Sequence, residues 1–144
     1  SKAYGLAGLR IGYAVVPQAW ADAYGRVSTP FAASEVALRA AMAALDDDEH
    51  VEKSVEGAAW AREYISDELA APTYPSEGNF VLCEVGDGEA VAEAAQREGV
   101  IVRDCGSFGL PSCIRISCGT ESGTRRAVET LNDILADRET AVEA

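Results

Sequence analysis

Three short apolar runs in the second half of the chain restrict its fold more than any other feature. They span residues 79–85, 100–104 and 113–118. The first run alternates apolar and polar side chains with the two-residue period of a β-strand. Glycine and proline lie on either side of the second and third runs, as is typical of turns between strands. The sequence therefore predicts a small three-stranded sheet in this half of the chain.

Helical segments surround these runs. Residues 50–69, 89–98 and those after Thr120 carry apolar side chains at the three- and four-residue spacing of one helix face. Gly99 follows the second segment at a position where helices often end, and Thr120 is suited to cap the third. From about residue 46 onward the order is α-β-α-β-β-α. This order predicts an α/β unit in which helices pack on the small sheet.

The first 45 residues have too few elements to build a core alone. Residues 11–16 read as a strand, and residues 18–26 and 34–45 read as helices, the longer one with Ser34 as its N-cap. One strand and two helices leave strand edges unpaired. We therefore expect this segment to pack on chain that is not in the sequence.

The acidic run at residues 46–49 marks the expected domain boundary. Residues 1–45 are then the end of a larger domain, and residues 46–144 form the small α/β domain. The chain lacks an initiator Met and begins on a motif rich in reactive side chains. We therefore expect it to be the C-terminal part of a longer protein.

Acidic residues dominate the charge. Asp and Glu total 24 against 12 Lys and Arg, which gives a formal net charge of −12. A surface of this sign repels nucleic acid and anionic membranes, so we expect neither as a partner. Two explanations fit: a plain solvated acidic face, or adaptation to high salt, where screening weakens the repulsion between carboxylates. The presence of only two lysines favours the second explanation.

A metal site and a membrane span are not expected. The four cysteines form no C-x-x-C pair, and the single histidine, His50, lies in an acidic segment where we expect a surface residue. Cys83, Cys113 and Cys118 lie in apolar runs and are expected to be reduced core residues. No apolar run approaches 18 residues and no secretory signal is recognisable, so we expect a cytoplasmic protein.

The first ten residues concentrate the reactive groups of the amino-terminal segment. Lys2 is one of the two lysines, with a hydroxyl beside it at Ser1 and a guanidinium at Arg10. The glycines between them permit a tight loop. An arginine binds a phosphate through two parallel hydrogen bonds, and a partly desolvated lysine can bond covalently to a carbonyl. These residues alone are also compatible with an ordinary glycine-rich turn.

The run SKAYGLAGLRIGY, residues 1–13, closely resembles the lysine motif of the fold-type I aminotransferases that use pyridoxal 5'-phosphate, in the branch of the histidinol-phosphate aminotransferases. That motif reads S-K-[AS]-[FY]-x-L-A-G-L-R-x-G-[FY], and it stands here without a gap. The resemblance implies that residues 1–45 are the last segment of the large cofactor-binding domain. It also implies that Lys2 is the catalytic lysine bonded to the cofactor aldehyde, and that Ser1 and Arg10 bind the cofactor phosphate.

Two arginines in the strands form a second set of candidates. Arg103 ends one predicted strand, and Arg115 lies in the middle of the next, on the face opposite its apolar neighbours. An arginine in a short apolar strand is costly to bury unless it meets an anion. From the residues alone, a structural ion pair or a solvated sheet face remains an alternative.

The resemblance extends to this region. The runs VRDC, residues 102–105, and GLPSCIRISCGT, residues 109–120, are similar to the C-terminal signature of the same family. It implies that Arg115 holds the substrate carboxylate or phosphate, and that Arg103 assists with the phosphate. Asn79-Phe80 fits the family's A-N-F strand start, with Gly78 in place of the alanine. A second departure is Ala32, where members commonly carry asparagine within P-[FY]-N-V-[ST].

Taken over residues 1–135, the resemblance implies amino transfer between histidinol phosphate and 2-oxoglutarate, in a homodimer with its site at the subunit interface. The carboxylate, stacking aromatic and hydrogen-bond partner for the cofactor ring come, in that family, from residues before the lysine. We therefore expect the isolated chain to be inactive. Two alternatives remain: an enzyme like threonine-phosphate decarboxylase of cobalamin synthesis, which shares the lysine motif, and a non-catalytic module that serves folding or association.

Overall fold

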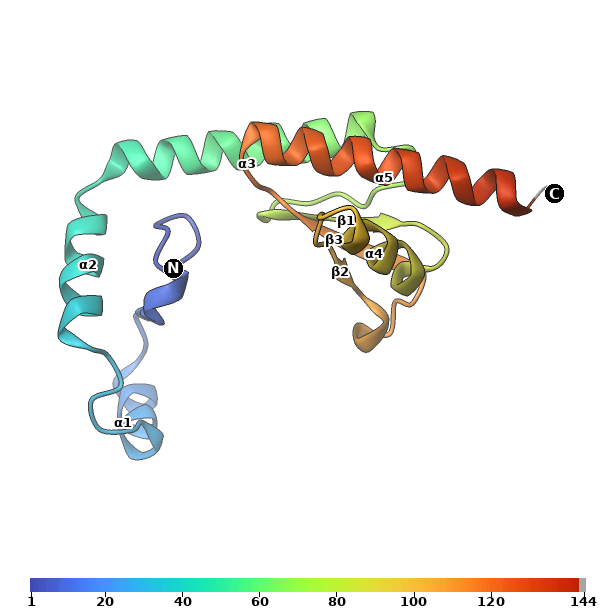
Figure 1. Ribbon diagram of the computed structural model, residues 1–144. Coiled ribbons are helices and arrows are strands. Elements are labelled where there is room, and N and C mark those ends of the chain that lie inside the picture. The colour runs from blue at the N-terminus through green and yellow to red at the C-terminus, as the bar shows by residue number, and fades with distance from the viewer. Residues whose placement is uncertain (143–144) are drawn as a thin grey trace. The chain divides into compact units, whose positions relative to one another are not determined.

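The computed structural model describes residues 1–142 and divides the chain into two compact units, Ser1–Ser54 and Val55–Ala144 (Figure 1). The helices are α1 (Gln18–Val27), α2 (Glu35–Leu45), α3 (Asp48–Glu68), α4 (Gly88–Arg97) and α5 (Glu121–Val142), with 3-10 turns η1 (Ala7–Leu9) and η2 (Gly106–Phe108). The strands are β1 (Phe80–Glu84), β2 (Arg103–Asp104) and β3 (Cys113–Ser117).

The second unit contains a three-stranded antiparallel sheet in the order β1-β3-β2. β1 pairs with β3 from Phe80 opposite Ser117 to Glu84 opposite Cys113. On the other side of β3, Arg103 of β2 lies opposite Arg115. The predicted order of helices and strands from residue 46 onward is confirmed, and the unit is of the α/β class.

Three helices cover one face of this sheet. The core joins alternate residues of β1 and β3 to the apolar stripes of α3, α4 and α5. Its members include Val81, Cys83, Ile114, Ile116, Ile65, Val91, Val128 and Leu131, which are almost completely buried. Burying a side chain of this kind contributes about 1.5–3 kcal/mol, which makes this cluster the main source of stability in the unit. The other face carries Leu82, Arg103 and Arg115, which are half-buried or exposed.

The predicted strand at 100–104 is shorter than expected. Only Arg103 and Asp104 pair with β3. Gly99 has a φ of +77°, as expected for a residue that ends a helix, and the backbone N–H of Val100 donates to the carbonyl of Ala95 at 2.9 Å. Val100 therefore completes the end of α4, and its N–H is not free to join the sheet.

The first unit has almost no core. The two predicted helices are present as α1 and α2, and the hydroxyl of Ser34 caps α2 by accepting from the N–H of Ala37 at 3.1 Å. Ala37 is the one fully buried residue of the unit. The predicted strand at 11–16 is wrong, because no described segment pairs with it. An extended segment is a strand only when a neighbour accepts its backbone hydrogen bonds.

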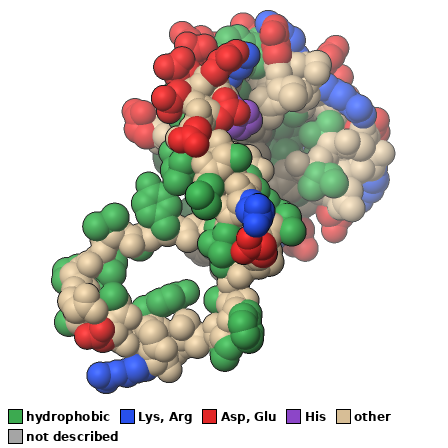
Figure 2. Space-filling view, turned by 90° about the vertical axis from the view of Figure 1, so that its left-hand side faces the viewer, with side chains coloured by type: hydrophobic (Ala, Val, Ile, Leu, Met, Phe, Trp, Pro, Cys, Tyr) green, Lys and Arg blue, Asp and Glu red, His purple; other side chains and the backbone are tan. Residues whose placement is uncertain are grey.

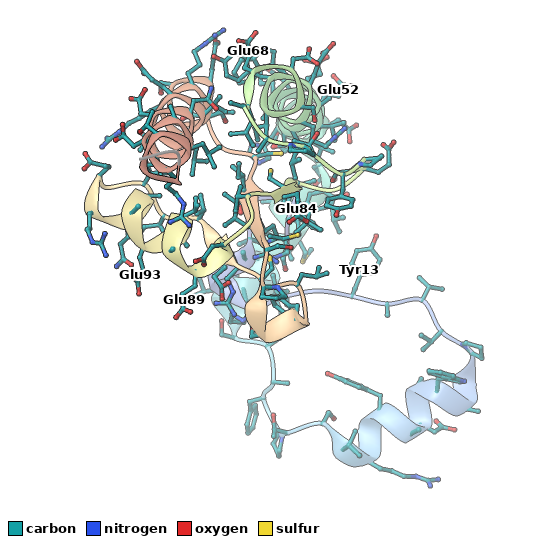
Figure 3. The ribbon with its side chains drawn as sticks, turned by 90° about the vertical axis from the view of Figure 1, so that its right-hand side faces the viewer. Tyr13, Glu52, Glu68, Glu84, Glu89 and Glu93 are labelled. Carbon is teal, nitrogen blue, oxygen red and sulfur yellow. The ribbon has the colours of Figure 1, made fainter. Side chains whose placement is uncertain are left out.

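Large apolar side chains of the first unit face outward. Tyr13, Val15, Trp20, Tyr24 and Phe31 are all mostly exposed. Figure 2 shows hydrophobic side chains standing on an open ring of chain, and Figure 3 shows Tyr13 projecting from the same segment. So many large apolar side chains exposed within one short segment are unusual in a folded protein and indicate a segment that packs on another. The unit matches the expectation that it cannot form a core alone. The proposed boundary at residues 45 and 46 stays a prediction.

All four cysteines are free thiols. Cys83, Cys105 and Cys113 are buried, and Cys118 is half-buried. Burial, with a smaller contribution from neighbouring Cys113, raises the pKa of the Cys83 thiol to about 12. The described residues contain no cluster suited to a metal ion, and none of their helices is long and apolar enough to span a membrane.

We expect Cys118 to react with iodoacetamide before the other three cysteines in the native chain. Only the thiolate reacts, and burial raises the pKa of all four thiols, so access of the reagent to the sulfur decides the order. Cys118 is half-buried, whereas the other three cysteines are buried. Mass spectrometry of digested samples at increasing labelling times would give the order. Equal rates at Cys83 and Cys118 would contradict the packing of β1, while unfolding in denaturant should expose all four cysteines alike.

Candidate functional site

The first candidate cluster is the loop at residues 1–11, which closes on itself. The N–H groups of Gly5 and Leu6 donate to the carbonyls of Lys2 and Ser1 at 3.1 and 3.0 Å. The hydroxyl of Ser1 donates to the carbonyl of Ile11. The loop therefore brings Ser1 next to the backbone that follows Arg10, and the amine, hydroxyl and guanidinium belong to one closed turn.

Arg10 holds an unusual backbone conformation. It ends η1 with φ 53° and ψ 43°, the left-handed region that few side chains other than glycine adopt readily. Its guanidinium donates to the carbonyl of Ala7 at 3.1 Å. A non-glycine residue held in this region costs about 1–3 kcal/mol, and such strain often occurs at ligand sites. The conformation is consistent with a constrained role for Arg10.

Gly5 shows why glycine is required in the loop. Its φ is +67°, and a Cβ atom there would lie 3.4 Å from Nε2 of His50. The His50 ring therefore lies beside the lysine loop. His50 is exposed, as predicted, and its Nε2 is 3.4 Å from the hydroxyl of Ser54. Its proximity to Gly5 has no signal in the sequence, since 45 residues separate them.

The side chain of Lys2 is exposed. It forms no ion pair with any carboxylate whose side chain the structure describes. The other lysine, Lys53, pairs with Glu49 at 2.5 Å, one helical turn away. The two lysines thus differ. The amine of Lys53 forms an ion pair on the surface of α3, and the amine of Lys2 forms none among the described side chains.

The second candidate cluster is the arginine pair of the sheet. Arg103 and Arg115 are direct partners on β2 and β3, so their side chains stand on the same face. Neither is ion-paired among the described residues, and Nε of Arg115 is buried without a hydrogen-bond partner. Like charges directly opposite each other destabilise a sheet. An unpaired cation pair of this kind is suited to bind an anion.

Two phenylalanines lie against this pair, and these contacts were not predicted from the sequence. Cζ of Arg115 is 5.2 Å from the centroid of Phe80, and Cζ of Arg103 is 5.6 Å from that of Phe108. Phe80 on β1 is diagonal to Arg115 on β3. This position follows from the register of the two strands. Phe108 belongs to η2, and the position of η2 depends on the turn after β2.

The carboxylate of Glu84 ends the same face of β1 (Figure 3). A hydrogen bond from Ser112, and a smaller effect of one from Cys113, hold the pKa of its carboxyl below the ordinary value. Sγ of Cys113 is 3.3 Å and the hydroxyl of Tyr74 3.4 Å from Oε2 of Glu84. Glu84 is therefore hydrogen-bonded to Tyr74, Ser112 and Cys113. It forms no ion pair with Arg103 or Arg115.

The candidates thus fall into two sets, one in each unit. Ser1, Lys2 and Arg10 share a loop of the first unit. Arg103 and Arg115 share a register position in the second unit.

Comparison with known proteins supplies a family. The profile of the family described as aminotransferase class I and II matches residues 1–131. The chain belongs to the aminotransferase class I and II family. A histidinol-phosphate aminotransferase from Haloferax volcanii, a haloarchaeon, is 75% identical over 141 residues, which are 98% of this chain and 39% of the relative. The chain therefore spans about two fifths of the length of a full aminotransferase of this kind.

Solved aminotransferase structures share the fold. A histidinol-phosphate aminotransferase from Sinorhizobium meliloti, in complex with pyridoxal-5'-phosphate, is 30% identical with a TM-score of 0.83, over 95% of this chain and 40% of that one. An L-threonine-O-3-phosphate decarboxylase from Porphyromonas gingivalis has a TM-score of 0.73 at 24% identity, over 93% and 44%. The second likeness concerns the fold alone.

Proposed function

We propose that this chain is the C-terminal part of a histidinol-phosphate aminotransferase, and that it carries the cofactor lysine and the substrate arginines. The observation that carries the proposal is the closed loop at residues 1–11, a single turn that carries an amine, a hydroxyl and a guanidinium. The 75% identity to the Haloferax volcanii relative over 98% of the chain supports the choice of substrate.

The loop residues fit pyridoxal phosphate by their chemistry. The amine of Lys2 would bond to the aldehyde, while the hydroxyl of Ser1 and the guanidinium of Arg10 would hold the phosphate. When bound, this cofactor supplies an electron sink for the bond that breaks at the substrate carbon. Nζ of Lys2 would then take up and return the proton of that carbon, as a general base and acid. Its lack of an ionic partner is consistent with this task.

The arginine pair fits a phosphorylated substrate. Arg103 and Arg115 present two cations on one face, and a phosphate dianion would neutralise both. Hydrogen bonds to charged groups contribute about 1.5–3 kcal/mol each, which is enough to orient a small substrate. We further infer that the full-length protein is a cytoplasmic homodimer.

A chimera tests the function. This chain would replace the matching C-terminal 39% of the Haloferax volcanii relative. We expect the purified chimera to transfer the amino group of histidinol phosphate to 2-oxoglutarate, and the isolated chain to show no turnover. Release of carbon dioxide from threonine phosphate would instead identify a decarboxylase. Failure on both substrates, by a folded chimera that binds the cofactor, would reject the assignment.

We also propose that the protein is adapted to high salt, and expect its unfolding temperature to rise with KCl concentration. The formal charge of −12 repels itself, and the Debye length falls from about 10 Å at 0.1 M to about 3 Å at 1 M salt. Circular dichroism melts between low and molar KCl would show the trend. A melting temperature independent of salt would contradict it, and sucrose at equal osmolarity separates charge screening from general exclusion effects.

A further inference from the structure

The guanidiniums of Arg103 and Arg115 each lie against the ring of a different phenylalanine. The distances from Cζ to the ring centroids, 5.6 Å at Phe108 and 5.2 Å at Phe80, are within the range of cation–π attraction. The chain has only three phenylalanines. Two of them therefore contact the two arginines of a single strand pair.

The ring of Phe80 also packs against the loop before β1. A Cβ added at Gly78 would lie 3.3 Å from Cε1 of Phe80, so the ring packs closely on the glycine. Oγ of Ser76 donates to the carbonyl of Phe80 and accepts from the N–H of Gly78 at 3.1 Å. Arg62 of α3 donates to the carbonyl of Gly78 at 2.8 Å. These contacts tie the loop before β1 to a long helix, and they fix the surface on which Arg115 rests.

The rings of Phe80 and Phe108 offset the repulsion between the two paired arginines. Arg103 and Arg115 are opposite each other, and repulsion between them would drive the guanidiniums apart. An aromatic face attracts a cation through its π-electrons and leaves the N–H groups at the edge of the guanidinium free. Stacking on Phe80 and Phe108 therefore keeps both cations in place without using a hydrogen-bond donor. Nε of Arg115 is buried, so the terminal N–H groups of that guanidinium are the donors for an anion.

We propose that Phe80 and Phe108 are positioning residues that each fix one of the two guanidiniums on the same face of the sheet, as a receptor for a phosphate dianion. The inference rests on the proposed substrate role of the arginine pair. A dianion neutralises both cations, and a monocarboxylate neutralises one. The stacked pair therefore favours a phosphomonoester over a simple carboxylate.

The test is a titration of the full chain with inorganic phosphate, and with acetate for comparison, at fixed KCl. Binding is followed by the arginine Nε–Hε signals in nitrogen-15 NMR spectra. We expect Phe80→Leu and Phe108→Leu each to weaken phosphate binding by roughly threefold to tenfold. Phe80→Tyr keeps the ring and should restore the affinity. Phe31→Leu is the matched control, because Phe31 is 99% exposed and belongs to the first unit.

The outcomes separate this inference from the proposed function. Loss with leucine, rescue with tyrosine and a shifted Arg115 Nε–Hε signal would support the positioning role. Unchanged phosphate affinity in Phe80→Leu and Phe108→Leu, while Arg115→Leu abolishes binding, would overturn the positioning role and leave the arginine site intact. Unchanged binding in Arg115→Leu would overturn both. Phe80 and Phe108 are 38% and 62% exposed, so the leucine variants should retain the fold.

Discussion

Lys2→Ala should abolish amino transfer in the chimera, with a loss of at least about 10³-fold, in the upper part of the usual range for removing a proton-transfer residue. The loss is expected because one amine serves two tasks: it attaches the cofactor, and it carries the proton at the substrate carbon. The visible absorbance of lysine-bound pyridoxal phosphate should vanish with the activity. Steady-state rates and absorbance spectra of the variant, at saturating cofactor, would measure both effects.

Lys53→Ala is the matched control, since the chain has only these two lysines. Lys53 is exposed and pairs with Glu49 one helical turn away, a contact that typically contributes only about 0.3–0.5 kcal/mol. The control should keep full activity and absorbance. Activity retained in Lys2→Ala would show that another amine holds the cofactor and would remove the basis of the proposed mechanism.

Gly88→Ala should destabilise the second unit by about 3 kcal/mol, near the upper end of the cost of overpacking a tight site. A Cβ atom at this position would lie 2.4 Å from the carbonyl oxygen of Cys113 and 3.0 Å from that of Pro111. Both neighbours are backbone atoms, so α4 or β3 must move. The N–H of Gly88 also donates to Pro111 at 2.9 Å, and this bond would be strained. Denaturant unfolding followed by circular dichroism gives the free-energy change.

Gly57→Ala provides the comparison, because Gly57 lies in α3 with no atom within 4 Å of an added Cβ. Alanine there should raise stability by roughly 0.5–1 kcal/mol, the ordinary preference for alanine over glycine in a helix. If both substitutions changed the unfolding free energy equally, the close approach of α4 to β3 would not be the cause.

Local signals in the sequence predicted most of the second unit. Thr120 accepts from the N–H of Gly123 at 3.3 Å at the start of α5, and Gly99 ends α4 with a positive φ. The two-residue alternation predicted the strand at residues 79–85, and Cys83, expected in the core, is buried. Such features depend on neighbours within a few residues, so the local sequence is enough to predict them.

The features that were missed depend on distant neighbours. Residues 11–16 have the composition of a strand, but no described segment pairs with them. The shortened strand at residues 100–104 is the exception, because the N–H of Val100 bonds locally to the carbonyl of Ala95. The contact of Phe80 with Arg115 follows from register, and that of His50 with Gly5 from the path of the chain between them. In the candidate site, Lys2, Ser1 and Arg10 could be proposed from one continuous motif. The pairing of Arg103 with Arg115 required the sheet.

The central claim is that Lys2 is the residue that holds the cofactor. The most direct measurement is borohydride reduction of the chimera after incubation with pyridoxal phosphate, followed by peptide mass spectrometry. Reduction fixes the cofactor permanently to the amine that binds it. We predict one dominant adduct, on the peptide that contains Lys2, and none on the peptide that contains Lys53. A dominant adduct on any other lysine, or no adduct on a folded chimera, would contradict the claim.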